Sequence, residues 1–127
     1  MKFIIAFLFL AHGFAHLVGF VGLFRLGESV PYNPTLLGGK FELGDAGARV
    51  FGILWLLAAL AFAAVALAVF MRVSWWPPLA LAVALVSLAF CVLGWPDARI
   101  GAAIDAVVIV LCLVVMRTGW LALTGQP

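Results

Sequence analysis

The chain has 127 residues, of which 68% are hydrophobic and 9% are charged. A soluble domain of this size has too much surface for such a composition, so most of these side chains must face lipid. The net charge of +2 is small and scattered, and no basic run or base-stacking pattern accompanies it, so nucleic acid is not expected as a partner. The composition indicates an integral membrane protein whose partner is the lipid bilayer.

Four apolar stretches follow one another, and each is long enough to cross a bilayer once. About 20 residues, rising 1.5 Å each, span a hydrocarbon core of about 30 Å. The third stretch starts late because Pro77 and Pro78 suit a first helical turn but not a helix interior. The expected spans are residues 3–24, 50–71, 78–95 and 100–117. The predicted fold is all-α, a single transmembrane domain over residues 1–127 that forms an integral membrane four-helix bundle.

Residues 25–49 form the one long connection between spans. Their prolines, glycines and asparagine are typical of turns rather than of a folded domain. The segment is long enough to lie across one end of the bundle. Two interpretations stay open at this point, a connector that follows the surface and a lid over a cavity.

The distribution of charge gives a weak indication of orientation. Four spans place both termini on one side, and positive charges alone are nearly equal on the two sides. The acidic residues Glu28, Glu42, Asp45 and Asp97 all fall on the side of the long connection. Because the terminal side then keeps uncompensated positive charge, we expect both termini in the cytoplasm and a multi-pass location in the cell (inner) membrane.

Apart from Arg117 at the very end of the fourth span, Asp105 is the only formally charged side chain inside any of the four apolar stretches. A carboxylate at the centre of a membrane helix costs about 2.5–3.5 kcal/mol on insertion scales, so it usually faces the bundle interior and has a partner. Apart from two cysteines, the only other ionisable groups of comparable burial are His12 and His16, which are four residues apart on the first span. The partner of Asp105 is therefore expected on that span.

Distances from the span ends refine this expectation. His16 lies roughly 13 Å down a helix from Arg25, and Asp105 lies roughly 9 Å down from Arg99 on the same side of the membrane. The two side chains are nearly level, with His12 one turn deeper. The sequence therefore predicts that His16 faces Asp105.

Further polar or amphipathic groups fall in the same half of the bilayer. Ser87 on the third span lies at about the depth of His12, Arg49 is placed at the start of the second span, and Trp55 lies less than two turns below Arg49. The candidate ligand-binding or proton-handling residues are His12, His16, Arg49, Trp55, Ser87 and Asp105.

Three chemistries fit the histidines and Asp105. Interhelical hydrogen bonding is common in membrane bundles. A proton-handling His and Asp pair is a second interpretation. Metal or haem ligation is the third, since the spacing of His12 and His16 suits two ligands on one helix face and Asp105 is the only credible third ligand. Trp55 either packs inside the bundle or lines a pocket for a flat ligand.

Cys91 and Cys112 are not expected to form a disulfide. Their distances from the ends of their spans differ by roughly 10 Å, whereas a disulfide requires Cα atoms about 4.4–6.8 Å apart. No CxxC motif is present, so nothing supports a dithiol oxidoreductase. Two free, buried thiols are predicted.

The segment Phe9-Leu10-Ala11-His12-Gly13-Phe14-Ala15-His16-Leu17-Val18-Gly19 resembles the first-span signature of the DoxX-like membrane proteins. In that signature a His-Gly pair is followed by a basic residue, an apolar pair and Gly. The Gly-led segment Gly52-Ile53-Leu54-Trp55-Leu56 is similar to the second span of the family, and the later spans resemble it only in architecture. His16 stands where the family usually has Lys, and Arg49 lies near the position of an acidic residue that often precedes the second span. The resemblance implies a membrane component of redox or sulfur metabolism, linked in several relatives to quinones.

Three function hypotheses follow. The first is a DoxX-like accessory or ligand-binding component of a membrane redox system, with a quinone-like small molecule as cofactor and haem or metal as less favoured ones. Its partners would be membrane oxidoreductase subunits or further copies of the chain. The second is a small homo-oligomeric transporter that couples protons to substrate through Asp105. The third is a structural or partner-binding subunit without chemistry of its own. Under all three hypotheses the catalytic residues are unassigned, and whether the chain is an enzyme stays open.

Overall fold

The computed structural model describes residues 2–119, and its four helices are all long and apolar enough to cross a membrane. The prediction of an all-α membrane bundle is confirmed. The helices are α1 (Lys2–Leu23), α2 (Gly44–Phe70), α3 (Trp76–Leu93) and α4 (Arg99–Thr118). A short antiparallel ladder joins β1 (Thr35–Leu36) to β2 (Phe41–Glu42) within the long connection, pairing Thr35 with Glu42 and Leu36 with Phe41.

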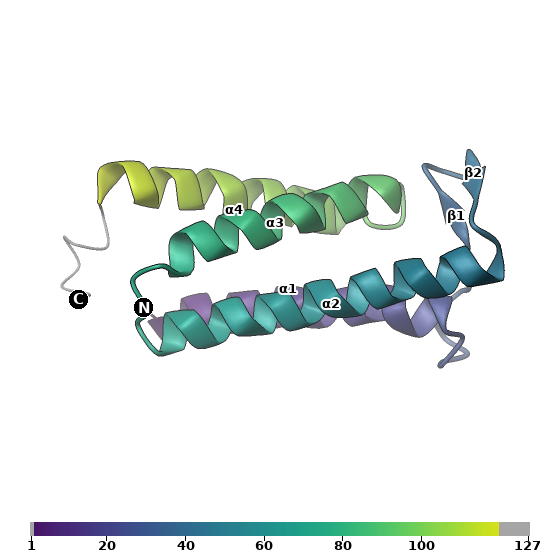
Figure 1. Cartoon of the computed structure of the whole chain (residues 1–127), viewed down its shortest axis with the longest axis horizontal. Coiled ribbons are helices and arrows are strands. Elements are labelled where there is room, and N and C mark those ends of the chain that lie inside the picture. The colour runs from purple at the N-terminus through teal and green to yellow at the C-terminus, as the bar shows by residue number, and fades with distance from the viewer. Residues whose placement is uncertain (1, 120–127) are drawn as a thin grey trace.

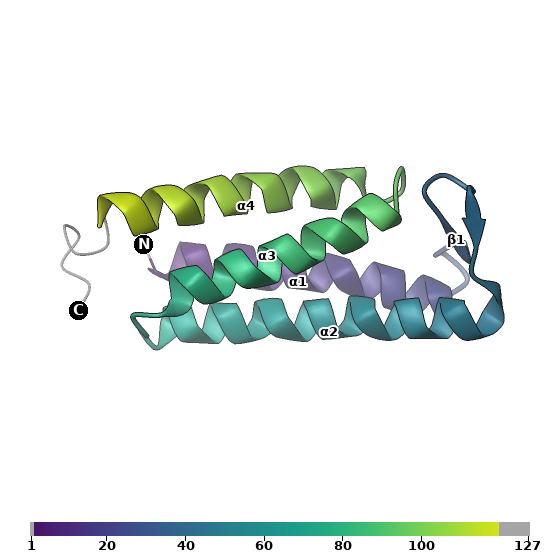
Figure 2. The same cartoon turned by 45° about the horizontal axis from the view of Figure 1, so that its top comes forward.

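The helices form two antiparallel hairpins that lie side by side along the long axis of the molecule (Figures 1 and 2). The most extensive packing is between α1 and α2, followed by that between α3 and α4, whereas α1 and α4 touch only sparingly. The long connection lies at the opposite end of the molecule from the start of α1 and the end of α4 (Figure 1). The bundle is therefore closed least tightly between its first and last helices.

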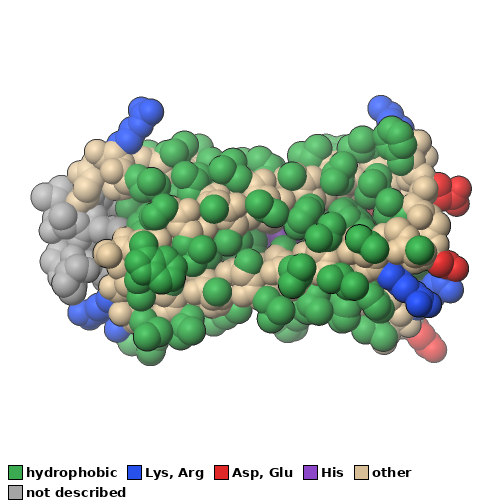
Figure 3. Space-filling model, viewed as in Figure 1, with side chains coloured by type: hydrophobic (Ala, Val, Ile, Leu, Met, Phe, Trp, Pro, Cys, Tyr) green, Lys and Arg blue, Asp and Glu red, His purple; other side chains and the backbone are tan. Residues whose placement is uncertain are grey.

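The outer surface matches a lipid environment. Hydrophobic side chains cover the middle of the molecule, and charged side chains gather at its two ends (Figure 3). Large apolar residues such as Phe14, Leu57 and Val107 are more than half exposed. A soluble protein rarely exposes so large an apolar surface, so these faces are the ones that contact lipid.

Two hydrophobic clusters occupy the interior. The larger lies toward the end that holds the start of α1 and is centred on Phe62 and Val65, both 0% exposed. The smaller lies toward the long connection and includes Phe51, Trp55 and Cys91. Along each of α1, α3 and α4 the buried polar side chains fall between these two clusters, so the polar layer is shielded at both ends by apolar packing.

Gly13 allows α1 and α2 to approach closely. A Cβ atom at this position would lie 2.8 Å from Cβ of Phe62 and 3.0 Å from the carbonyl oxygen of Ala59. Since one of these neighbours is backbone, no side-chain rotation would make room. Small residues at such crossings are how membrane helices pack closely, and here the crossing sets the position of the adjacent His12.

The second helix begins earlier than the sequence analysis placed it. Residues 44–49 were expected in the connection, but α2 already starts at Gly44. Gly44 adopts a left-handed φ of +65°, which glycine tolerates, and Asp45 lies in the first turn, where a carboxylate favours the positive end of the helix dipole. These signals outweigh the glycine-rich composition. The remaining bounds differ from the expected spans by one or two residues at each end.

The long connection bonds to the turn between α3 and α4. The backbone N–H of Leu37 donates to the carbonyl of Leu93 at 2.8 Å, and that of Gly38 donates to the carbonyl of Trp95 at 2.7 Å. Asn33 donates through its side chain to Asp97 at 2.9 Å. The connection therefore lies across the end of the second hairpin as a strap, here defined as residues 24–43.

We expect the Gly13→Ala substitution to destabilise the protein by about 1–3 kcal/mol, because the added methyl group overpacks a crossing that has no free volume. Ala11→Val, which adds volume at an exposed position of the same helix, is the matched control and should change stability little. Denaturant-induced unfolding in mixed micelles measures both. Equal effects of the two substitutions would show that the α1–α2 crossing is not as close as described.

Candidate functional site

Four buried polar side chains from three helices form one hydrogen-bonded network. Nε2 of His12 lies 2.8 Å from Oδ1 of Asp105. The Ser87 hydroxyl lies 2.6 Å from Oδ2 of Asp105 and also 2.6 Å from Nε2 of His16. The four residues are at most 6% exposed, and Asp105 and Ser87 are 0% exposed. The network ties α1 to both α3 and α4, so it holds the two hairpins together at mid-depth.

The direct partner of Asp105 is His12, and not His16 as the depth argument predicted. His16 reaches Asp105 only through Ser87. The prediction was wrong because the charged residues at the span ends do not lie at one common depth. The α3–α4 turn instead lies short of the start of α2 at Gly44, and the strap lies beyond that turn (Figure 1). Asp105 is therefore about one helical turn deeper than expected, level with His12.

The hydrogen bonds of the network determine how many protons it holds. Nδ1 of His16 lies 2.9 Å from the carbonyl oxygen of His12, so it carries a hydrogen and donates. The two short contacts of Ser87 require two hydrogens, but the hydroxyl supplies one. The second hydrogen belongs either to Nε2 of His16, as an imidazolium facing a carboxylate, or to Oδ2 of Asp105, as a carboxylic acid facing a neutral imidazole.

Both arrangements give the same total charge. A neutral His12 donates through Nε2–H to Oδ1 of Asp105 and keeps Nδ1 as a bare acceptor, and this Nδ1 atom is buried without a partner among the described residues. With one proton shared between His16 and Asp105, the four side chains together are neutral. Neutrality is what a low-dielectric membrane interior favours, since an isolated charge there is costly.

Aromatic rings from α2 hold the histidines in place. The Phe62 ring centroid lies 4.7 Å from the ring of His12 and 5.3 Å from that of His16. The Trp55 indole lies 5.3 Å from His16 on the side of the strap. The second helix therefore contributes apolar walls to the network rather than a polar group, and both rings exclude lipid and water from it.

The metal interpretation can be compared with this geometry. Ligand atoms of His12, His16 and Asp105 all lie within 4.8 Å of one another, and their types suit zinc or iron. Bonds of 2.0–2.1 Å to a tetrahedral ion would bring the ligand atoms to about 3.3 Å from one another. In the structure these atoms instead bond to each other and to Ser87. A metal ion would have to replace the hydrogen bond between His12 and Asp105, so the donor set is present but is arranged as a hydrogen-bonded network.

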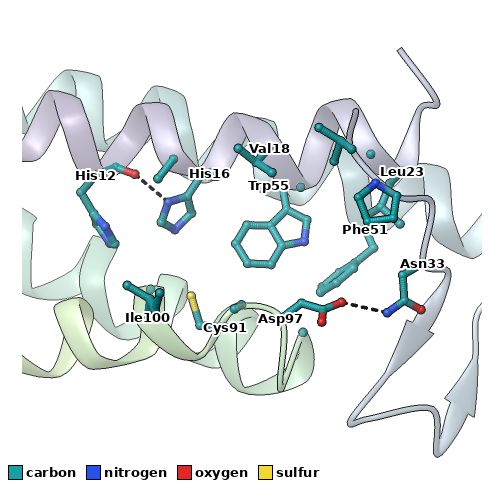
Figure 4. Close-up of a pocket in the computed structure, with 18 of the residues that line it drawn as sticks. His12, His16, Val18, Leu23, Asn33, Phe51, Trp55, Cys91, Asp97 and Ile100 are labelled. Carbon is teal, nitrogen blue, oxygen red and sulfur yellow. Dashed lines mark hydrogen bonds between the residues drawn. The ribbon is translucent and has the colours of Figure 1, made fainter. Parts of the chain in front are cut away.

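A cavity of about 380 Å³ adjoins the network on the side of the strap. Figure 4 shows His16, Trp55 and Phe51 along it, with Cys91 and Ile100 opposite. Most of its wall is apolar. Its lining residues are His12, Ala15, His16, Val18, Gly19, Gly22, Leu23, Val30, Pro31, Asn33, Thr35, Phe51, Trp55, Cys91, Gly94, Asp97, Ala98, Ile100, Gly101 and Ile104.

Glycine residues make room for this cavity and for Trp55. A Cβ atom on Gly19 would lie 2.7 Å from Cγ of Trp55, and one on Gly101 would lie 2.9 Å from Sγ of Cys91. The indole can therefore lie against α1 only because residue 19 has no side chain. Trp55 is in the cavity wall, and its indole N–H makes no hydrogen bond with the residues drawn around it (Figure 4).

The strap closes one end of the cavity. Val30, Pro31, Asn33 and Thr35 contribute to the lining, and the hydrogen bond from Asn33 to Asp97 joins the strap to the turn after α3 at the rim (Figure 4). Residues 25–49 had two interpretations, a connector that follows the surface and a lid over a cavity. The strap residues in the lining favour the lid.

Arg49 lies away from the network and the main cavity. It is exposed and lines a separate hollow of about 250 Å³ with Arg25, Tyr32 and Asp45. There Asp45 accepts hydrogen bonds from Tyr32 at 2.9 Å and from Arg25 at 3.2 Å. Arg49 therefore does not share a site with the histidines, although the sequence analysis grouped them. Its side chain lies off the buried face of α2, on which Phe51 and Trp55 lie, and this explains the difference.

Cys91 is part of the site, a position that the sequence analysis did not give it. Its thiol lies 3.6 Å from Oδ2 of Asp105 and also faces the cavity. Its spacing of four residues from Ser87 places both on one face of α3, and this was the signal available in the sequence. Cys91 and Cys112 are both free and buried, as predicted.

No protein-family model, no curated protein and no solved structure matches this chain. The chemistry of the site is therefore read from its own residues.

The pairing of His12 with Asp105 is testable by a double-mutant cycle. We expect His12→Leu and Asp105→Leu each to destabilise the protein by about 1–3 kcal/mol, since the surviving partner is left buried and unpaired. The double variant should be less destabilised than the sum of the single variants. Unfolding free energies in micelles provide the measurement, with Ala11→Leu in place of His12→Leu as the control cycle. Additive effects in the His12 cycle would contradict the contact.

Neutrality of the network predicts that Asp105→Asn is tolerated. The amide of Asn accepts from His12 through its oxygen and donates to Ser87 through its NH₂ group, so it reproduces the carboxylic acid arrangement. We expect a cost below about 1 kcal/mol for Asn, compared with about 1–3 kcal/mol for Leu at the same position. A loss of stability with Asn as large as with Leu would mean that a carboxylate charge is required.

Proposed function

We propose that this chain is a four-span protein of the cell (inner) membrane that binds a flat, amphipathic small molecule of the quinone class. In this proposal it acts as an accessory or ligand-binding component of a membrane redox system, with both termini in the cytoplasm. The observation that carries the proposal is the cavity of about 380 Å³ between the polar network and the strap. Small-molecule sites in proteins have volumes of about 300–1,000 Å³ and largely apolar walls with a few polar groups.

The wall chemistry favours a flat ring with carbonyl oxygens. Phe51 and Trp55 supply aromatic faces, and their ring centroids lie 5.7 Å apart at an interplanar angle of 71°. The indole N–H of Trp55 is a donor without a protein acceptor nearby, and a ring carbonyl oxygen is an acceptor that can pair with it. Asp97 is the one carboxylate among the lining residues, and it already accepts a hydrogen bond from Asn33 of the strap.

The resemblance of the first span to the DoxX-like proteins agrees with this proposal. The residues that carry the resemblance include His12 and Gly13, and the same residues take part in the network and the α1–α2 crossing; His16, where the family usually has Lys, belongs to the network as well. A role beside a membrane oxidoreductase follows from the resemblance, whereas the ligand-binding role follows from the cavity.

Proton-coupled transport is supported less well. A coupling carboxylate must meet the solvent or the substrate during the transport cycle, but Asp105 is 0% exposed and is not among the residues that line the cavity. A purely structural role for the chain does not explain the cavity or the indole N–H of Trp55, which makes no hydrogen bond with the residues around it (Figure 4). Ligand binding accounts for both features.

The test is binding of a short-chain alkyl benzoquinone to the purified protein in lipid nanodiscs, with extraction and absorption spectroscopy of co-purified quinone, haem and metal. We expect saturable binding that Trp55→Phe weakens about three- to tenfold, the equivalent of one hydrogen bond. Trp95→Phe, at an exposed position outside the cavity, is the matched control. Absence of saturable binding, or equal effects of both substitutions, would contradict the proposal; a stoichiometric metal would favour ligation by His12, His16 and Asp105 instead.

A further inference from the structure

The cavity has an open side, and the exposed residues of its wall show where that side lies. On α2 and α3 the lining residues Phe51, Trp55 and Cys91 are all buried. On α1 the lining residue Val18 is 54% exposed, and on α4 the lining residue Ile100 is 69% exposed. The wall therefore reaches the surface between the first and the last helix.

The sparse packing between α1 and α4 agrees with this position. These two helices touch far less than the helices within either hairpin. Two further lining residues, Ala15 on α1 and Ile104 on α4, are exposed on the same side. Ala15, Val18, Ile100 and Ile104 together are called the α1–α4 opening below.

The depth of the opening places it in the hydrocarbon region. Ala15 lies eight residues before the end of α1 at Leu23, and Ile104 lies five residues after the start of α4 at Arg99. At 1.5 Å per residue these positions are roughly 12 Å and 8 Å inside the helix ends. All four residues of the opening are apolar, as lipid-facing residues are. The gap between Ala15 and Ile104 therefore leads to the bilayer, whereas Ile100 is one residue after the start of α4 and lies nearer to the membrane surface.

The aqueous end of the cavity is covered. The strap contributes Val30 and Pro31 to the wall, and two backbone hydrogen bonds and the Asn33–Asp97 pair fasten it to the α3–α4 turn. These three hydrogen bonds hold the strap in place over this end of the cavity, where the lining residues Pro31, Asn33 and Asp97 are exposed. Entry from the side requires only the movement of apolar side chains.

We propose that the α1–α4 opening is a lateral entrance through which a membrane-dissolved quinone with an apolar tail inserts its ring into the cavity. The inference rests on the proposed function and extends it to a route and a ligand class. The ring lies beside Trp55 and His16, and the indole N–H donates to a ring carbonyl. The tail leaves between Ala15 and Ile104 and stays in lipid, so the ligand is a molecule with one ring and one apolar chain.

A photoreactive probe tests the route. The probe is an alkyl benzoquinone with a diazirine on its tail, added to the full chain in lipid nanodiscs and located by mass spectrometry after irradiation. We expect saturable adducts on residues 15–18 and 100–104 that excess unlabelled alkyl benzoquinone removes. Ala15→Phe should lower this labelling about tenfold by filling the opening. Ala11→Phe, one turn away on the exposed face of α1 and outside the cavity, should lower it less than about twofold.

A second pair of variants keeps the test decisive if Ala15→Phe folds poorly. Ile104→Trp narrows the opening from α4, and Val107→Trp is its exposed control outside the cavity. Saturable adducts on residues 30–35, unchanged by either blocking substitution, would overturn the lateral route and leave the ligand-binding function standing. Absence of saturable adducts in the unsubstituted chain would overturn both. A phospholipid that co-purifies and that the probe does not displace would overturn the quinone as occupant.

Discussion

The burial of the Asp105 carboxyl group inside a membrane bundle is the constraint on which the rest of the structure depends. Each unsatisfied polar atom there costs free energy, so α1 and α3 must supply partners at the depth of Asp105 on α4. His12 and Ser87 bond to its two oxygens, and His16 extends the chain of hydrogen bonds through Ser87. The shared proton keeps the network neutral, which allows it to lie between two apolar clusters without a counter-ion from outside.

The network also determines where a ligand can bind. It joins the two hairpins at mid-depth, and the strap joins them again at one end through the α3–α4 turn. Between these two attachments the bundle retains a cavity. The side chains of Phe51 and Trp55 form part of its wall, and the glycines of α1 and α4 leave room for it. Because α1 and α4 pack sparingly, that cavity opens toward lipid. From the network outward, the cavity therefore has a polar layer, then an aromatic wall and then an apolar entrance. This order suits an amphipathic molecule.

The four helices and the importance of Asp105 could be predicted from the sequence, because hydrophobic length and an isolated intramembrane charge are local signals. His12, His16 and Ser87 were candidates for the same reason. The pairing of His12 with Asp105 was not predictable, since it depends on how far the α3–α4 turn lies from the start of α2, and this offset is a property of the tertiary packing. Arg49 was grouped with the site because it was expected at the same membrane face as the histidines, but its depth does not determine which face of α2 its side chain lies on. Cys91 was missed because a lone thiol in a span carries no signal of its own.

The most direct test of the account is ¹⁵N NMR of the histidine and tryptophan side chains in lipid bilayers, before and after addition of an alkyl benzoquinone. The account predicts a protonated Nδ1 on His16, a bare Nδ1 on His12 with its proton on Nε2, and no positive charge on His12. It further predicts that the ligand shifts the Trp55 indole N–H and the His16 ring more than the His12 ring. Two independently charged imidazoles, or a Trp55 resonance that the ligand leaves unmoved, would contradict it.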